Sequence, residues 1–91
     1  MSQKISALRN PATNRSFGAW QQEVLETLAS DPTNKPWNPL KSLRGSAKNW
    51  TSRYRSALVA LEEAGLIAES VGPKGGRGYY VATEALVRAV A

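Results

Sequence analysis

The sequence contains neither cysteine nor histidine. The chain therefore forms no disulfide and no thiolate or imidazole metal site, and nucleophile and base pairings that use either residue are excluded. The remaining serine, lysine, aspartate and glutamate residues show no spacing that pairs a base with a nucleophile. We expect a protein that is not an enzyme and that uses neither a metal nor another cofactor.

Long apolar runs are absent as well. Residues 1–15 hold no apolar stretch of signal-peptide length, and no segment approaches the ~20 apolar residues of a membrane span. Hydrophobic residues nevertheless make up 42% of the 91 residues, and three of them are tryptophan. This composition predicts one folded domain in a cytoplasmic protein with no membrane partner.

Acidic residues are missing from two windows of a chain whose formal net charge is +5. None lies between Asp31 and Glu62, and none lies between Ser70 and Thr83. The first window contains Lys35, Lys41, Arg44, Lys48, Arg53 and Arg55, and the second contains Lys74 and Arg77. Such a segregation of charge predicts a positive surface for a polyanion; the alternative is a solvated basic face that only promotes solubility.

The first half of the chain predicts a helix, a break and a second, short helix. Ser16 is a favourable N-cap for a helix that runs to about Ala29, with apolar residues at spacings of three and four. The stretch "SDPTNKP" ends this helix because its two prolines lack backbone donors. Trp37 follows as an isolated short strand, and a short helix has Asn38 as its N-cap and Gly45 as its stop.

Residues 49–64 give the clearest helical pattern. At ~100° per residue, one side of this helix collects Trp50, Tyr54, Ala57, Leu58, Leu61 and Ala64. The opposite side carries Thr51, Ser52, Arg55 and Ser56 in its first half, and Glu62 and Glu63 in its last turns. Hydroxyl groups and cations in the N-terminal half suit a helix that enters an anionic groove N-terminus first; the alternative is an ordinary surface helix.

The glycine-rich stretch "GPKGGRGYY" lies between two short strands, "LIAESV" and "GYYVAT". A phosphate loop of a nucleotide-binding protein would instead end in Gly-Lys-Ser or Gly-Lys-Thr and lead into a helix. Arginine- and glycine-rich RNA-binding tracts are repeated and disordered, whereas this stretch occurs once, between strands. We predict that residues 72–78 form the exposed tip of a β-hairpin. Binding of RNA or single-stranded DNA by this tip stays open as an alternative.

The two ends of the chain are less patterned. Thr83 is an N-cap for a final helix over residues 84–91, whose apolar side chains predict packing on the first helix or half of a dimer interface. Residues 1–15 predict either a short helix anchored by Ile5 and Leu8 or a loose basic arm.

The segment "PLKSLRGSAKNWTSRYRSALVALEEAGLIAESVGPKGGRGYYVATEA" resembles the core of winged helix-turn-helix domains. The resemblance covers about half of the chain and is closest in "ALVALEEAGLI", the glycine-rich turn and "YYVATEA". Two residues depart from the pattern of this family: Ala82 replaces the usual larger apolar residue before Thr83, and Trp50 is unusual at the start of the recognition helix. The resemblance implies an α+β, mostly α fold over residues 16–83, with a three-helix core, a short strand and a two-stranded hairpin wing before the C-terminal helix.

The resemblance also implies a function. The chain would bind double-stranded DNA as a nucleoid-associated transcriptional regulator, commonly a homodimer, with the recognition helix 49–64 in the major groove and the wing 72–78 on the minor groove or the backbone. The implied DNA-binding residues are Lys41, Arg44, Lys48, Thr51, Ser52, Arg53, Arg55, Ser56, Lys74 and Arg77. Arg55 is the predicted base contact, because an arginine fork pairs bidentately with guanine.

Two other functions are compatible with the same sequence. One is a DNA-organising or plasmid or phage maintenance protein with weak sequence preference, which differs from a regulator in its specificity ratio. The other is a winged-helix module for protein–protein interaction without DNA binding, because a fold does not dictate its function.

Overall fold

The computed structural model describes residues 3–31, 33–42 and 50–91. In chain order, its elements are α1 (Gln3–Ser6), β1 (Arg9–Asn10), β2 (Arg15–Ser16), α2 (Ala19–Ser30), α3 (Pro39–Ser42), α4 (Trp50–Glu63), β3 (Ile67–Ser70), the 3₁₀ turn η1 (Pro73–Gly75), β4 (Tyr79–Ala82) and α5 (Glu84–Val90). The described chain is therefore an α+β fold in which helices predominate, as the sequence predicted. None of the helices in these ranges is long and apolar enough to cross a membrane.

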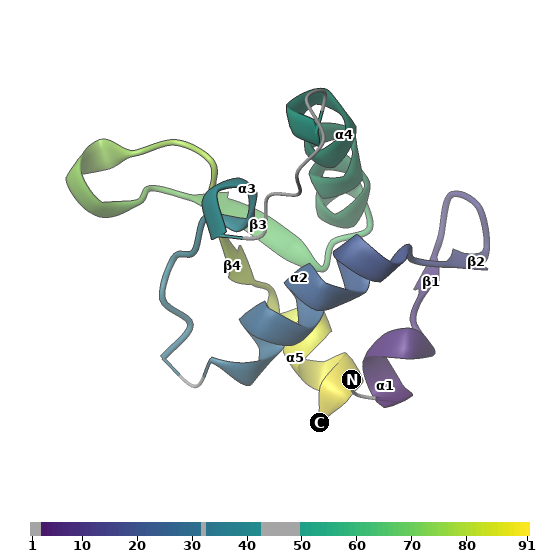
Figure 1. The fold of residues 1–91 in the computed structure, drawn as a ribbon. Coiled ribbons are helices and arrows are strands. Elements are labelled where there is room, and N and C mark those ends of the chain that lie inside the picture. Colours follow the sequence, from purple (N-terminus) through teal and green to yellow (C-terminus); the bar gives the residue numbers. More distant parts are fainter. Residues whose placement is uncertain (1–2, 32, 43–49) are drawn as a thin grey trace.

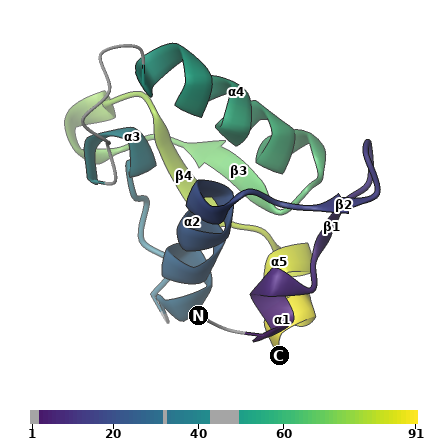
Figure 2. The same cartoon turned by 45° about the vertical axis from the view of Figure 1, so that its right-hand side comes forward.

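The elements form two groups on opposite sides of the molecule. α1 and α5 lie together on one side, and α3, α4 and the loop between β3 and β4 lie on the other (Figures 1 and 2). α2 runs between the two groups (Figure 1). The segments with the predicted basic character thus share one side of the fold.

The hydrophobic core lies between the helices and the β3–β4 sheet. Leu58 and Leu61 of α4 are 1% and 0% exposed, which confirms the inward side that the spacing predicted for this helix. Trp20 of α2 stacks on Tyr54 of α4 with ring centroids 4.5 Å apart. The buried core residues are Ile5, Phe17, Val24, Leu25, Leu28, Leu58, Leu61, Leu66, Ile67, Ala82 and Leu86.

The predicted N-cap at Ser16 is wrong. Ser16 belongs to β2, and α2 begins at Ala19 with Gly18 as its N-cap. Gly18 N–H donates to the side-chain oxygen of Gln21 at 2.9 Å, which satisfies the donor that precedes the helix. Phe17 stands outside the helix with its side chain buried. Burial of this ring explains why the helix starts later than the cap preference of serine predicts.

The sheet has β4 at its centre. β3 and β4 pair antiparallel, and Trp37 forms a single bridge on the other edge of β4. Trp37 N–H donates to Tyr80 O at 3.0 Å and Tyr80 N–H donates to Trp37 O at 2.8 Å. Asn34 continues this edge with its side chain, which donates to Ala82 O at 3.2 Å and accepts from Ala82 N–H at 3.0 Å. The predicted isolated strand at Trp37 is therefore present as one bridge.

α5 follows β4 directly, is capped at its N-terminus and packs on other helices. Thr83 Oγ1 accepts from Leu86 N–H at 3.3 Å, which confirms the predicted N-cap. The same hydroxyl donates to Gly65 O at 2.6 Å, where Gly65, with φ +78°, follows the end of α4. Leu86 is fully buried, and α5 contacts α1 and α2. A role of α5 in a dimer stays a prediction.

Candidate nucleic-acid interface

α4 presents a polar side to solvent in the part of it that the structure describes. Arg53, Arg55 and Ser56 are exposed, and Val59, which lies one turn beyond Arg55, is 48% exposed. This side is the one left over when Leu58 and Leu61 turn into the core. Thr51 and Ser52 lie in the first turn of the helix, and their side chains are outside the described structure.

Arg55 of α4 acts electrostatically on Tyr80 of β4. Burial raises the pKa of Tyr80 in β4, and the carboxylates of Glu62 and Glu69 raise it further. The guanidinium of Arg55 acts in the opposite direction, because a nearby positive charge stabilises the phenolate. All three charged groups therefore act on the Tyr80 phenol through space.

The loop between β3 and β4 is a compact, exposed turn that presents Lys74 and Arg77. Gly72 N–H donates to Gly76 O at 3.0 Å, and Gly75 N–H donates to Gly72 O at 3.1 Å. Both cationic side chains are exposed. A Cβ atom at Gly72 would lie 2.2 Å from the Tyr79 ring, so glycine is required where this ring covers the backbone. The loop is therefore held in one shape by Tyr79 while its cations stay in solvent.

The exposed cations of α4 and of the loop have no acidic partner. No carboxylate in the described ranges forms an ion pair with Arg53, Arg55, Lys74 or Arg77. Arg88 of α5, by contrast, pairs with Glu84 one turn away. Since α4 and the loop share one side of the molecule (Figures 1 and 2), their charges add to the positive potential on that side.

Besides Thr51 and Ser52, three further predicted residues have no described side chain. Lys41 lies in α3, but its side chain is outside the described structure. Arg44 and Lys48 lie outside the described residues altogether. The structure thus exposes Arg53, Arg55 and Ser56 along α4, with Arg53 and Arg55 on different sides of the helix, and places Lys74 and Arg77 on the β3–β4 loop.

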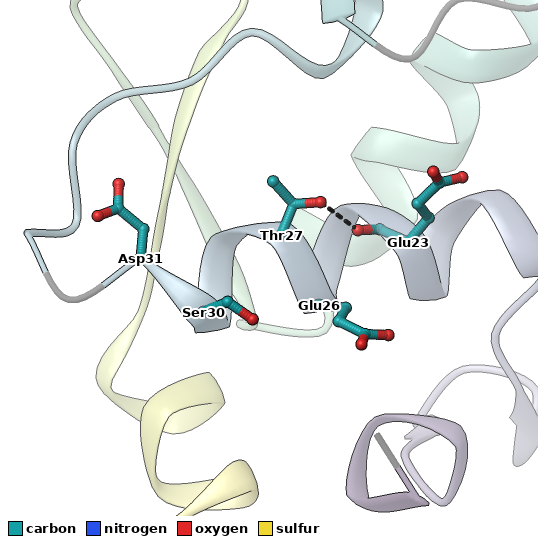
Figure 3. Close-up of a pocket in the computed structure, with 5 residues that line it drawn as sticks. All are labelled: Glu23, Glu26, Thr27, Ser30 and Asp31. Atoms are coloured by element: carbon teal, nitrogen blue, oxygen red, sulfur yellow. Dashed lines mark hydrogen bonds between the residues drawn. The ribbon is translucent and has the colours of Figure 1, made fainter. Parts of the chain in front are cut away.

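Acidic side chains gather on a different element. An open hollow along α2 is lined by Glu23, Glu26, Thr27, Ser30 and Asp31 (Figure 3). The Asp31 carboxylate accepts from Thr33 N–H at 2.9 Å and from Thr33 Oγ1–H at 2.7 Å, and these hydrogen bonds lower its pKa below 3.8. The carboxylate is therefore firmly anionic at neutral pH. Among the described residues, no group of three or more carboxylates is placed to hold a metal ion.

Comparison of the chain with protein-family models, curated proteins and solved structures found no match.

Proposed function

We propose that the protein is a winged helix-turn-helix protein that binds double-stranded DNA and regulates transcription. The observation that supports this function best is the set of exposed, unpaired cations on α4 and on the β3–β4 loop, two elements on the same side of the fold. The order of α2, the Trp37 bridge, α3, α4, the β3–β4 hairpin and α5 is the order expected for such a domain.

In this proposal, α4 enters the major groove with its N-terminal half. Arg55 reads a guanine, and Thr51, Ser52 and Ser56 contact base edges or phosphates beside it. Glu62 and Glu63 keep the C-terminal end of the helix away from the phosphates.

The remaining cations position the protein on the backbone. Arg53 and Lys48 bind flanking phosphates, Lys41 and Arg44 hold the strand in front of α3, and the loop cations Lys74 and Arg77 reach the adjacent minor groove or its phosphates. These contacts supply affinity but read no sequence, because phosphates are alike along the duplex.

A DNA-organising protein would use the same surface with a smaller specificity ratio. The cations placed on the backbone above outnumber the side chains placed on bases, which favours this second candidate because phosphate contacts discriminate little between sequences. A homodimer of either kind would place its two recognition helices in half-sites about 10 base pairs, or a multiple of that, apart.

Binding to duplex DNA should weaken steeply with salt. If one subunit neutralises on the order of five phosphates, the log–log slope of affinity against salt concentration is about −4.5. Fluorescence anisotropy with labelled duplex DNA, single-stranded DNA and RNA measures this slope for each ligand. Absence of salt-dependent binding to any nucleic acid would contradict the proposal and favour the protein-interaction module.

Two arginine variants should separate base reading from phosphate binding. Arg55→Ala is expected to reduce discrimination between a preferred and an unrelated duplex by about 1–3 kcal/mol, because a bidentate contact to guanine is lost. Arg77→Ala should weaken binding to both duplexes by similar factors and make the salt slope shallower by about 0.9. A selected duplex and a scrambled one, titrated with each variant, give both quantities.

Arg88→Ala is the matched control for these variants, because Arg88 is paired with Glu84 on the opposite side of the fold. It should leave affinity and discrimination near their wild-type values. Equal losses for Arg55→Ala and Arg77→Ala on every sequence would show that α4 does not read bases.

A further inference from the structure

The β1–β2 hairpin is ordered, although it contributes no apolar side chain to the core. Arg9 pairs with Ser16 and Asn10 pairs with Arg15. The turn closes on Asn10, whose side chain accepts from Ala12 N–H at 3.0 Å and whose carbonyl accepts from Asn14 N–H at 2.7 Å. Residues 11–16 are all exposed. Burial of apolar side chains in the hairpin therefore does not explain why the hairpin forms.

The base of this hairpin is fixed to α2, which in turn is hydrogen-bonded to α4. Phe17, which follows β2 directly, is 4% exposed, and its carbonyl accepts from Gln22 Nε2 at 2.8 Å. Gln21 Nε2 donates to Ala57 O in the middle of α4 at 3.0 Å. Figures 1 and 2 show the β1–β2 hairpin on one side of α4 and the β3–β4 loop on the other. The exposed part of α4 thus stands between two hairpins.

The charge of the β1–β2 hairpin resembles that of the β3–β4 loop. Residues 1–22 contain no aspartate or glutamate. Arg9 and Arg15 are exposed, and neither forms an ion pair within the described part of the chain. Because partners across a ribbon share a face and neighbours along a strand alternate, the pairing places Arg9 and Arg15 on opposite faces. The ribbon therefore carries one unpaired cation on each face.

We propose that the β1–β2 hairpin is a second wing that binds phosphates of the same duplex, on the side of α4 opposite to the β3–β4 loop. This inference rests on the proposed function, because it needs α4 in the major groove. A hairpin with a cation on each face reaches a phosphate on either side of it. The contact adds affinity without reading sequence, because it involves only the backbone.

The double variant Arg9→Ala/Arg15→Ala tests the second wing. Loss of two phosphate contacts should make the log–log slope of affinity against salt shallower by about 1.8. An increase in salt from about 50 to 200 mM should then weaken binding of the variant by a factor that is ~12-fold smaller than the factor for the wild type. Affinity at about 100 mM salt should fall by on the order of tenfold, and the ratio between a preferred and a scrambled duplex should stay constant. The measurement is the same anisotropy titration on the full chain.

Two further variants make the result specific. Lys4→Ala/Arg88→Ala removes the same total charge from α1 and α5, on the side of the fold away from α4 and the β3–β4 loop, and should change the slope little. Arg9→Lys/Arg15→Lys keeps the charge and should restore the wild-type slope, which separates loss of a cation from damage to the hairpin. Failure of the lysine variant to restore the slope overturns the inference.

The remaining outcomes distinguish the inference from the proposed function. A salt-dependent wild type, with equal slopes for the hairpin variant and the Lys4 and Arg88 control, refutes the second wing alone. A wild type without salt-dependent duplex binding refutes the proposed function itself. A loss confined to RNA or single-stranded DNA assigns the hairpin to another ligand and also overturns the inference.

Discussion

Leu61→Ala is expected to lower the free energy of unfolding by about 2–5 kcal/mol, the range for removing a buried leucine side chain. Leu61 is 0% exposed, and its carbonyl accepts from Leu66 N–H at 3.2 Å where α4 turns back toward β3. Truncation leaves a cavity at the contact between α4 and the core, which these rigid elements fill only in part. A domain of this size has a total stability of roughly 5–14 kcal/mol, so the loss is a large fraction of it.

Urea unfolding followed by tryptophan fluorescence measures this loss, and Val59→Ala is its control. Val59 lies on the same helix two residues earlier and is 48% exposed. Its truncation should cost less than about 1 kcal/mol, because a half-exposed side chain leaves no closed cavity. Equal losses for the two variants would mean that α4 does not bury the side described above, and the exposure of Arg55 would then be in doubt as well.

The inward side of α4 was predictable because helical spacing encodes it directly. Leu58 and Leu61 recur at three residues, and a period of 3.6 leaves only one side of the helix for both. The exposure of Arg55 follows from the same period. The strand β4 was equally predictable from the sequence, because "YYVA" combines aromatic and β-branched residues after a glycine-rich turn.

Features that depend on contacts distant in the sequence could not be predicted in this way. Ser16 has the better cap preference, but burial of Phe17 moves the helix start to Ala19. The strands β1 and β2 have two residues each, too few for an alternating pattern to be visible. The hairpin that carries Arg9 and Arg15 was therefore not predictable from a local pattern.

The candidate interface, too, was predictable only in part from the sequence. Charge segregation is a property of the sequence, and it predicted a positive surface on α4 and on the β3–β4 loop. The electrostatic effect of Arg55 and Glu69 on Tyr80 depends on how α4 and β3 pack around β4, which no local pattern reports. The structure therefore adds that acidic groups act on the same part of the sheet as the predicted cation.

The loop before Trp37 gives the second large effect, since Asn34→Ala should lower the free energy of unfolding by about 2–4 kcal/mol. The Asn34 side chain pairs with both backbone groups of Ala82, at 3.2 and 3.0 Å, and Ala82 is 7% exposed. Without the amide, this donor and acceptor of β4 lose their partners near the core. Asn34 also has φ +50°, where alanine is strained and asparagine is tolerated.

Asn34→Gly separates these two causes. Glycine removes the amide but tolerates positive φ, so its loss should be smaller than that of alanine by about 1 kcal/mol. Urea unfolding of both variants gives the comparison, and near-ultraviolet circular dichroism reports whether Trp37 keeps its environment. If both variants retain wild-type stability, the amide does not serve as the partner of Ala82. The far edge of β4 would then be held by the Trp37 bridge alone, and the β3–β4 hairpin would not depend on the loop that follows α2.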